Sequence, residues 1–225
     1  MPPIGRAAAW LAVTLLACAP AAAWASPVEP PATATAVDAI GPTASDDIRA
    51  MAAWVVASAD GKGLPFVIVD KVHAQVASFD AAGVLKGTAP ALLGVASGDV
   101  SPPGIGTMRL SQITPAMRIT PAGRFEATLG RDLGPDDVLW VDYDAAVSLH
   151  RVVTHKPAER RLQRLASATV LDNRISFGCI NVPARFYDDV IRPLFRPANG
   201  IVYILPETPA FGSLQAKLGA HTAPS

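Results

Sequence analysis

Cys179 is the residue of this chain best suited to act as a nucleophile. The chain has 225 residues and two cysteines, Cys18 and Cys179. A free thiol with a pKa of about 8.5 is only slightly ionised at neutral pH, a deficit of about 2 kcal/mol that a neighbouring base would offset. Composition alone leaves Cys179 either a buried, inert side chain or a reactive thiol.

The residues around Cys179 favour the reactive alternative. Gly178 allows unusual backbone angles directly before the cysteine, and Asn181 with Pro183 is typical of a helix start. We therefore expect Cys179 on a turn just ahead of a helix N-terminus. The helix dipole there would favour a thiolate, and the turn would direct backbone N–H groups at a developing oxyanion.

Histidine is the expected partner base, and the chain has four. His150 ends a strand-like segment, whereas His155 follows in a loop. His73 belongs to an early hairpin and His221 to the C-terminal tail. The alternative for each is a surface or structural histidine, and this alternative is favoured for His73, His155 and His221 but not for His150. We predict His150 as the base and keep His155 as the alternative.

The N-terminal segment indicates export. Arg6 precedes an apolar run over residues 7–19, and Ala25 ends a small-residue cleavage site. Alternatives are lipidation at Cys18 or an uncleaved anchor helix. All three place the domain in the periplasm or cell envelope. Cys179 is then an unpaired thiol in an oxidising compartment.

The remaining pattern predicts one mostly β domain with a few short helices. The predicted organisation is a signal peptide (1–25), a Pro/Ala-rich linker with a possible short helix (26–60), the domain (61–207) and a flexible tail (208–225). We expect strands over 65–70, 73–79, 91–96, 125–129, 138–143, 146–153 and 201–205, and helices over 46–57, 158–166 and 184–195.

Charge and motif content exclude several classes of function. The 19 basic and 19 acidic residues give a net charge of zero, which argues against a nucleic-acid partner. We find no metal-ligand cluster and no phosphate-binding loop in the sequence, so no cofactor or metal is expected.

Two motifs resemble the L,D-transpeptidase (YkuD-type) catalytic domain. Residues 176–181, SFGCIN, match the family's Ser/Thr-His-Gly-Cys-hydrophobic-Asn/Arg signature at every position except Phe177. Residues 120–125, TPAGRF, match its Thr-Pro-x-Gly-x-Phe element. The resemblance covers residues 64–206 and implies a single L,D-transpeptidase-like β-sandwich domain.

The resemblance also implies a reaction. Cys179 would form a thioester with the tetrapeptide stem of peptidoglycan, and an amine acceptor would resolve it as a 3→3 cross-link or a protein anchor. His150 would be the general base. Backbone N–H groups of Phe177, Gly178 and Cys179 would form the oxyanion hole. Ser176 and Asn181 would orient the loop.

The chain departs from the family in two ways. Phe177 replaces the second histidine of the motif, where an aromatic ring would instead shape the donor pocket. His150 lies 29 residues before Cys179, a longer gap than the family's usual spacing. We expect residues 157–173 to absorb the difference as a flap, whose Arg160, Arg161 and Arg164 either contact a substrate carboxylate or form a solvated face.

The sequence leaves other functions open. A cysteine hydrolase, acting as an L,D-carboxypeptidase or amidase, would share the acyl-enzyme and differ only in using water as acceptor. A non-catalytic wall-binding domain is the alternative from another class. An NlpC/P60-type peptidase is disfavoured because its cysteine precedes its histidine. Expected partners are stem peptides and a protein acceptor, with membrane contact only if Cys18 is lipidated.

Overall fold

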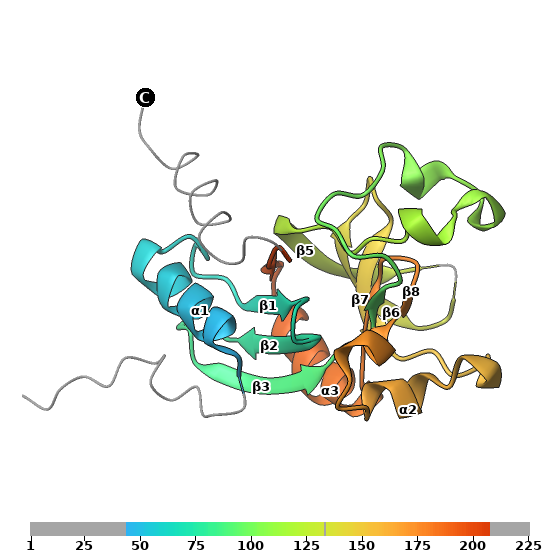
Figure 1. Ribbon diagram of the computed structural model, residues 1–225. Helices are drawn as coiled ribbons and strands as arrows, with labels where there is room; N and C mark the ends of the chain where they lie inside the picture. The colour runs from blue at the N-terminus through green and yellow to red at the C-terminus, as the bar shows by residue number, and fades with distance from the viewer. Residues whose placement is uncertain (1–43, 133, 208–225) are drawn as a thin grey trace, which may run out of the picture. The chain divides into compact units, whose positions relative to one another are not determined.

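The computed structural model of the chain describes residues 44–132 and 134–207. They form a mostly β domain with a barrel-like eight-stranded sheet, a separate two-stranded sheet and short helices (Figure 1). The expected fold class is confirmed. The predicted signal peptide and tail lie outside the described residues.

The large sheet is mixed. In hydrogen-bonded order its strands are β3 (Leu85–Pro90), β2 (Gln75–Phe79), β1 (Phe66–Asp70), β10 (Gly200–Ile204), β5 (Gly123–Arg131), β6 (Asp137–Asp142), β7 (Val147–Arg151) and β9 (Ile180–Val182). Two neighbouring pairs, β1 with β10 and β7 with β9, are parallel, and the others are antiparallel. The small sheet pairs β4 (Leu93–Gly94) with β8 (Arg174–Ser176) in parallel.

Most of the predicted strands are present, and the differences have local causes. The strand expected over 91–96 is reduced to β4, while β3 was not predicted because LKGTAP holds a glycine, a proline and a lysine. Such a sequence is tolerated at a sheet edge, where one side of the strand needs no partner. The strand β3 lies at that edge, beside β2.

Helix α1 (Asp46–Ser58) belongs to the folded domain. Ser45 caps it by accepting a hydrogen bond from the backbone N–H of Ile48 at 3.2 Å, and two aspartates occupy its first turn. Its buried face is formed by Ile48, Met51, Ala52 and Val55. The compact region therefore starts before residue 61, the predicted boundary.

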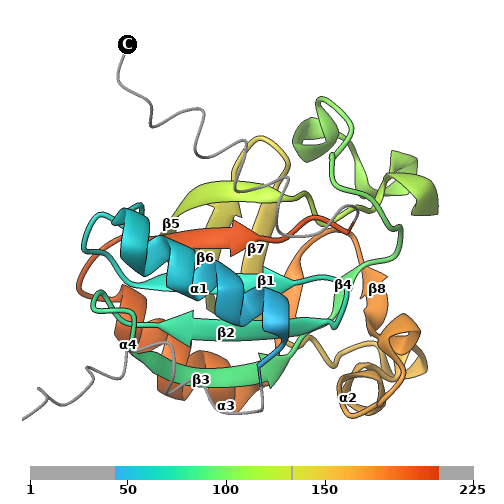
Figure 2. The ribbon, with the colours of Figure 1, turned by 60° about the vertical axis from the view of Figure 1, so that its left-hand side comes forward.

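The alternation of β1 divides the core into two clusters. Phe66 and Ile68 pack with α1 on one face, whereas Val67 and Val69 face a second cluster on the other. The second cluster includes Tyr187 and residues of the helical segment made by α3 (Ala184–Phe186), a π-helical stretch (Tyr187–Ile191) and α4 (Arg192–Phe195). Figure 2 shows α1 and the orange helices on opposite sides of β1 to β3.

Two excursions leave the sheet. Residues 97–122 carry three short 3-10 helices, Ile105–Thr107, Leu110–Gln112 and Pro115–Met117, and stand out from the sheet (Figure 1). Residues 157–173, between β7 and β8, carry Pro157–Glu159, α2 (Arg161–Leu165) and Val170–Asn173. This second excursion is the insert expected from the long gap between His150 and Cys179.

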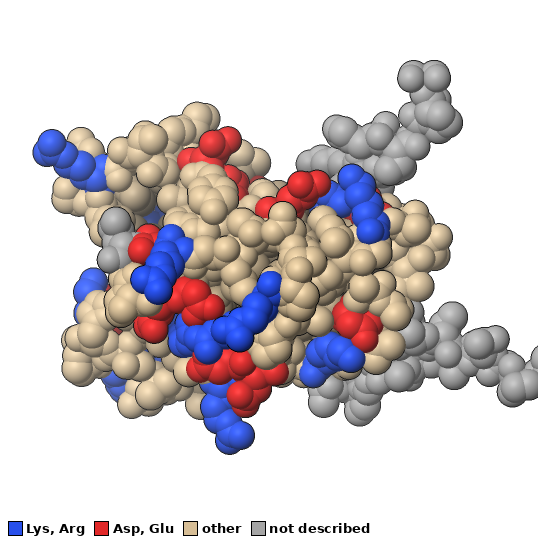
Figure 3. Space-filling view, turned by 180° about the vertical axis from the view of Figure 1, so that it is seen from behind, with Lys and Arg blue, Asp and Glu red and all other residues tan. Residues whose placement is uncertain are grey.

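Charged groups of both signs are interspersed on the surface. In Figure 3 basic and acidic side chains lie side by side on one face. Ion pairs join Arg151 and Arg192 to Asp137 and Asp188, with N···O distances of 2.7–3.0 Å. Within residues 44–132 and 134–207, no helix is long and apolar enough to cross a membrane.

Replacing Met51 with alanine should test whether α1 is part of the fold. Met51 is fully buried, so Met51→Ala should lower the free energy of unfolding by about 2–4 kcal/mol. Chemical denaturation measures this change. Val56→Ala, at a position 41% exposed on the same helix, should change stability by no more than about 0.5 kcal/mol. Equal, small effects of both variants would contradict the packing of α1.

Candidate active site

The parallel pairing of β7 with β9 brings His150 close to the loop that carries Cys179. Leu149 pairs with Ile180 and His150 pairs with Asn181, so the strand carrying the histidine runs beside the strand that follows Cys179. His150 is the penultimate residue of β7, as the sequence predicted for a strand end. Cys179 lies in the loop between β8 and β9 and is half-buried.

The expected helix N-terminus at Cys179 is absent from this loop. Residues after Cys179 form β9, and α3 begins only at Ala184, with Pro183 at its N-cap position. Asn181 therefore caps no helix; its side chain turns toward His150. The helix predicted from residue 184 onward is present. The strand β9 that precedes it was not predicted, because its three residues, INV, are too few to show a periodic pattern. No helix-dipole effect on Cys179 follows.

His150 and Cys179 shift each other's pKa. Burial alone would raise the pKa of Cys179, but the hydrogen bond and charge of His150 outweigh it, and the pKa is lowered. Burial lowers the pKa of His150, but the interactions with Cys179 and with the carbonyl of Arg151 outweigh it, and the pKa is raised. The two shifts favour a thiolate–imidazolium pair.

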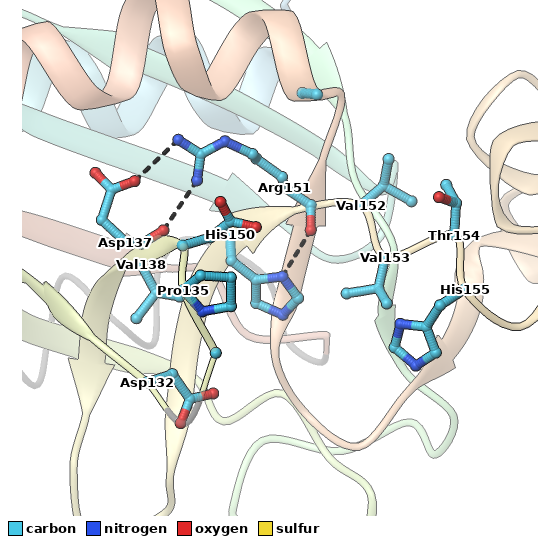
Figure 4. A pocket seen from close by; sticks show the side chains of 13 residues that line it. Asp132, Pro135, Asp137, Val138, His150, Arg151, Val152, Val153, Thr154 and His155 are labelled. Atoms are coloured by element: carbon cyan, nitrogen blue, oxygen red, sulfur yellow. Dashed lines mark hydrogen bonds and ion pairs between the residues drawn. The ribbon is translucent and has the colours of Figure 1, made fainter.

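The orientation of the imidazole is fixed by a main-chain carbonyl. His150 Nδ1 lies 2.7 Å from the carbonyl oxygen of Arg151 (Figure 4). Because a carbonyl only accepts, Nδ1 carries a proton and Nε2 has the lone pair in the neutral ring. Nε2 is therefore the atom that takes a proton. The Arg151 side chain is itself anchored by Asp137 and Asp188.

Ser148 is a further contact of the thiol. Its Oγ lies 3.7 Å from Cys179 Sγ, and the Sγ lies 3.6 Å from the carbonyl oxygen of Ala146. Ser148 precedes His150 by two residues, so both side chains project from the same face of β7. Sequence analysis missed Ser148, although this two-residue spacing on a predicted strand was the available signal.

The loop before Cys179 is held by Ser176. Its Oγ donates to the carbonyl of Cys179 at 2.6 Å and accepts from the backbone N–H of Gly178 at 3.1 Å. That second bond occupies Gly178, one of the three predicted oxyanion donors. The N–H groups of Phe177 and Cys179 are the two remaining candidates.

The segment at residues 120–125 packs against the loop that carries Cys179. Thr120 is buried; its Oγ1 donates to the carbonyl of Gly178 at 2.8 Å and accepts from the backbone N–H of Gly94 at 2.9 Å. The two motifs that resemble the L,D-transpeptidase family, residues 120–125 and 176–181, are therefore in contact. Phe177 stacks against Arg118, whose guanidinium carbon lies 3.7 Å from the ring centroid.

Asn181 connects the base to the excursion at residues 157–173. Its Nδ2 lies 3.3 Å from His150 Nε2 and 3.4 Å from the carbonyl of Cys179. Its Oδ1 accepts a 2.6 Å hydrogen bond from Arg161. Arg161 is thus turned inward, whereas Arg160 is exposed and Arg164 bonds backbone carbonyls of its own segment.

A pocket of about 520 Å³ opens beside the imidazole (Figure 4). Its wall includes His150, His155 and the acidic residues Asp132, Asp136 and Asp137. His155 lies on the loop after β7, and in Figure 4 its ring lies apart from that of His150. His73 instead bonds Asp70, and His221 lies outside the described residues.

The arrangement suits nucleophilic catalysis by a thiol. Cys179 Sγ would attack an electrophilic carbon while Nε2 of His150 takes its proton, as in other thiol–imidazole pairs. Among the described residues, no group of three or more histidine, cysteine, aspartate or glutamate side chains could hold a metal ion.

The chain is similar to a solved structure, but no family model or curated protein matches it. Among solved structures, the chain is similar to the NMR structure of the catalytic domain of an L,D-transpeptidase from E. faecium, at 18% identity and a TM-score of 0.34. The similarity covers 62% of this chain and 95% of that one. A likeness of this degree carries no functional assignment, which must come from the site itself.

Removing His150 should slow alkylation of Cys179. Because His150 lowers the pKa of the thiol, His150→Ala should raise it, reduce the thiolate fraction at neutral pH and slow reaction with iodoacetamide several-fold. The pH dependence of the alkylation rate should move to higher pH. His155→Ala is the matched control and should leave the profile unchanged. If His155→Ala gave the larger shift, His155 would be the partner base.

Gly178→Ala should distort the nucleophile loop. Gly178 has φ of +133°, and an added Cβ would lie 2.8 Å from the carbonyl oxygen of Ile119. The backbone must therefore shift, at a cost of about 1–3 kcal/mol in stability, with altered thiol reactivity. Thermal unfolding and alkylation rates measure both effects.

Gly104→Ala provides the comparison, because Gly104 also has positive φ, +75°, but open space around the added Cβ. It should lose stability without a change in the alkylation rate. Identical alkylation rates in the Gly178 and Gly104 variants would argue against the tight loop described here.

Proposed function

We propose that this protein is an exported L,D-transpeptidase of peptidoglycan, with Cys179 as nucleophile and His150 as general base. The observation that carries the proposal is the Cys179–His150 pair: β7 and β9 bring the two residues together, Arg151 holds the Nδ1 proton, and each side chain shifts the pKa of the other toward a thiolate–imidazolium pair. The substrate class comes from the resemblance of residues 176–181 and 120–125 to that family. Export rests on the N-terminal segment, outside the described residues.

The first half-reaction forms the acyl-enzyme. Sγ of Cys179 attacks the carbonyl carbon of the third stem residue, and the thiol proton passes to Nε2 of His150. The oxyanion would be stabilised by the N–H groups of Phe177 and Cys179. The C–N bond then breaks, the D-amino acid leaves with the proton from His150, and the thioester remains on Cys179.

The second half-reaction returns the enzyme to its starting state. The acceptor amine attacks the thioester carbonyl, His150 removes the amine proton, and the C–S bond breaks. The proton returns to the thiolate, and an amide replaces the amide that was cleaved. Because one amide is exchanged for another, the reaction needs neither water nor an external energy source. The acceptor would be a stem side-chain amine or a protein lysine.

Products from a disaccharide-tetrapeptide should identify the reaction. Incubation with the purified chain should yield cross-linked dimers, detected by mass spectrometry, and Cys179→Ala should abolish them. Cys179→Ser should retain little activity, because a serine hydroxyl is far less ionised than a thiol. Full activity in Cys179→Ala would overturn the proposal, and tripeptide without dimers would identify a hydrolase instead.

A further inference from the structure

Arg161 contacts the site from an excursion outside the sheet. It lies in α2, within residues 157–173, and its side chain is only 11% exposed. Nη1 donates to Asn181 Oδ1 at 2.6 Å, and Nε donates to Glu159 Oε2 at 2.5 Å. Glu159 therefore holds one side of the guanidinium while the other side reaches the buried amide beside His150.

The contact with Arg161 determines which way the Asn181 amide faces. A guanidinium only donates hydrogen bonds, so Oδ1 must face Arg161 and Nδ2 must face the opposite way. The backbone of Asn181 is already fixed, since its N–H and carbonyl both bond Leu92, at 2.9 and 2.8 Å. With backbone and amide both held, Nδ2 is presented to His150 Nε2 at 3.3 Å and to the carbonyl of Cys179 at 3.4 Å.

We propose that Arg161 is a positioning residue that fixes the amide of Asn181 and, through it, the imidazole ring of His150. The inference rests on the proposed function for its catalytic meaning. Nδ2 can donate to Nε2 only while the imidazole is neutral, because a protonated Nε2 has no lone pair. The amide and the nearby positive charge therefore both disfavour the imidazolium.

Disfavouring the imidazolium form of His150 is useful in a two-step acyl transfer. His150 must first take a proton from Cys179 and then give it to the leaving amine. Burial lowers the pKa of His150 and the charge of Arg161 lowers it further, whereas Cys179 and the carbonyl of Arg151 raise it and outweigh both. Arg161 thus favours release of the proton from His150 to the leaving amine. The excursion at residues 157–173 therefore contributes a positioning residue to the site.

Other charged groups around the imidazole must be considered in any pH experiment. Besides Cys179 and Arg161, the titratable and charged residues around the adjoining pocket are Asp132, Asp136, Asp137, Arg151 and His155. None of these is changed in the variants below, so their contribution is the same in each.

The test measures the titration of His150 by NMR of the histidine ring protons in the full-length chain. In Arg161→Gln the loss of positive charge should move the His150 titration to higher pH. Arg161→Lys keeps a charge and a donor and should return the titration toward that of the unaltered chain. Arg160→Gln removes an equal charge from an exposed position on the same segment and should leave the titration unchanged. Thermal unfolding of each variant checks that the fold persists.

Kinetics supply the second readout. Arg161→Gln should lower kcat on a disaccharide-tetrapeptide roughly tenfold with KM unchanged, because the base is mispositioned while the binding surface is intact. An unchanged His150 titration in Arg161→Gln, or an equal shift in Arg160→Gln, would overturn the inference. The titration needs no substrate, so absence of turnover in every variant would count against the proposed function alone.

Discussion

The pairing of β7 with β9 is the constraint on which the site depends. It aligns His150 with Asn181 in adjacent parallel strands, and Cys179 lies two residues before Asn181. Parallel neighbours require a long crossover connection, and here residues 152–179 make it. The chain uses this connection to supply Arg161 as well as the nucleophile loop. A long separation in sequence therefore becomes a short one in space.

Behind this pairing, buried polar groups hold the nucleophile loop. Thr120 joins Gly178 to Gly94, and Lys71, fully buried, bonds the carbonyls of Gly98 and Thr120 and the carboxylate of Asp99. The excursion at residues 97–122 is thus tied down at both ends, beside the loop that carries Cys179. Burial lowers the pKa of Lys71, and the hydrogen bond and charge of Asp99 offset part of this effect.

Sequence analysis predicted the elements whose periodicity is long enough to read. It located β7 and its histidine, α1, and the helical segment after Pro183, because apolar spacing extends over several residues in each. It missed β3, β8 and β9, which form through pairing rather than through propensity. The neighbourhood of Cys179 was consequently predicted as a helix start, although the cysteine itself was correctly placed in a loop between elements.

The contact between Arg161 and Asn181 depends on tertiary structure and could not be predicted. Arg161 and Asn181 lie 20 residues apart, and nothing in their spacing shows that one determines the amide orientation of the other. Ser148 was predictable from alternation, but only once the strand register was known.

Trapping the acyl-enzyme tests the central claim most directly. The chain is mixed with disaccharide-tetrapeptide, quenched in acid, and analysed by intact-protein mass spectrometry with peptide mapping. The Cys179–His150 pair predicts a donor adduct, one D-amino acid shorter than the substrate, on the peptide that contains Cys179 and cleavable by hydroxylamine. Its formation should be much slower in His150→Ala. Product formation with no such adduct, or an adduct on another residue, would contradict the account.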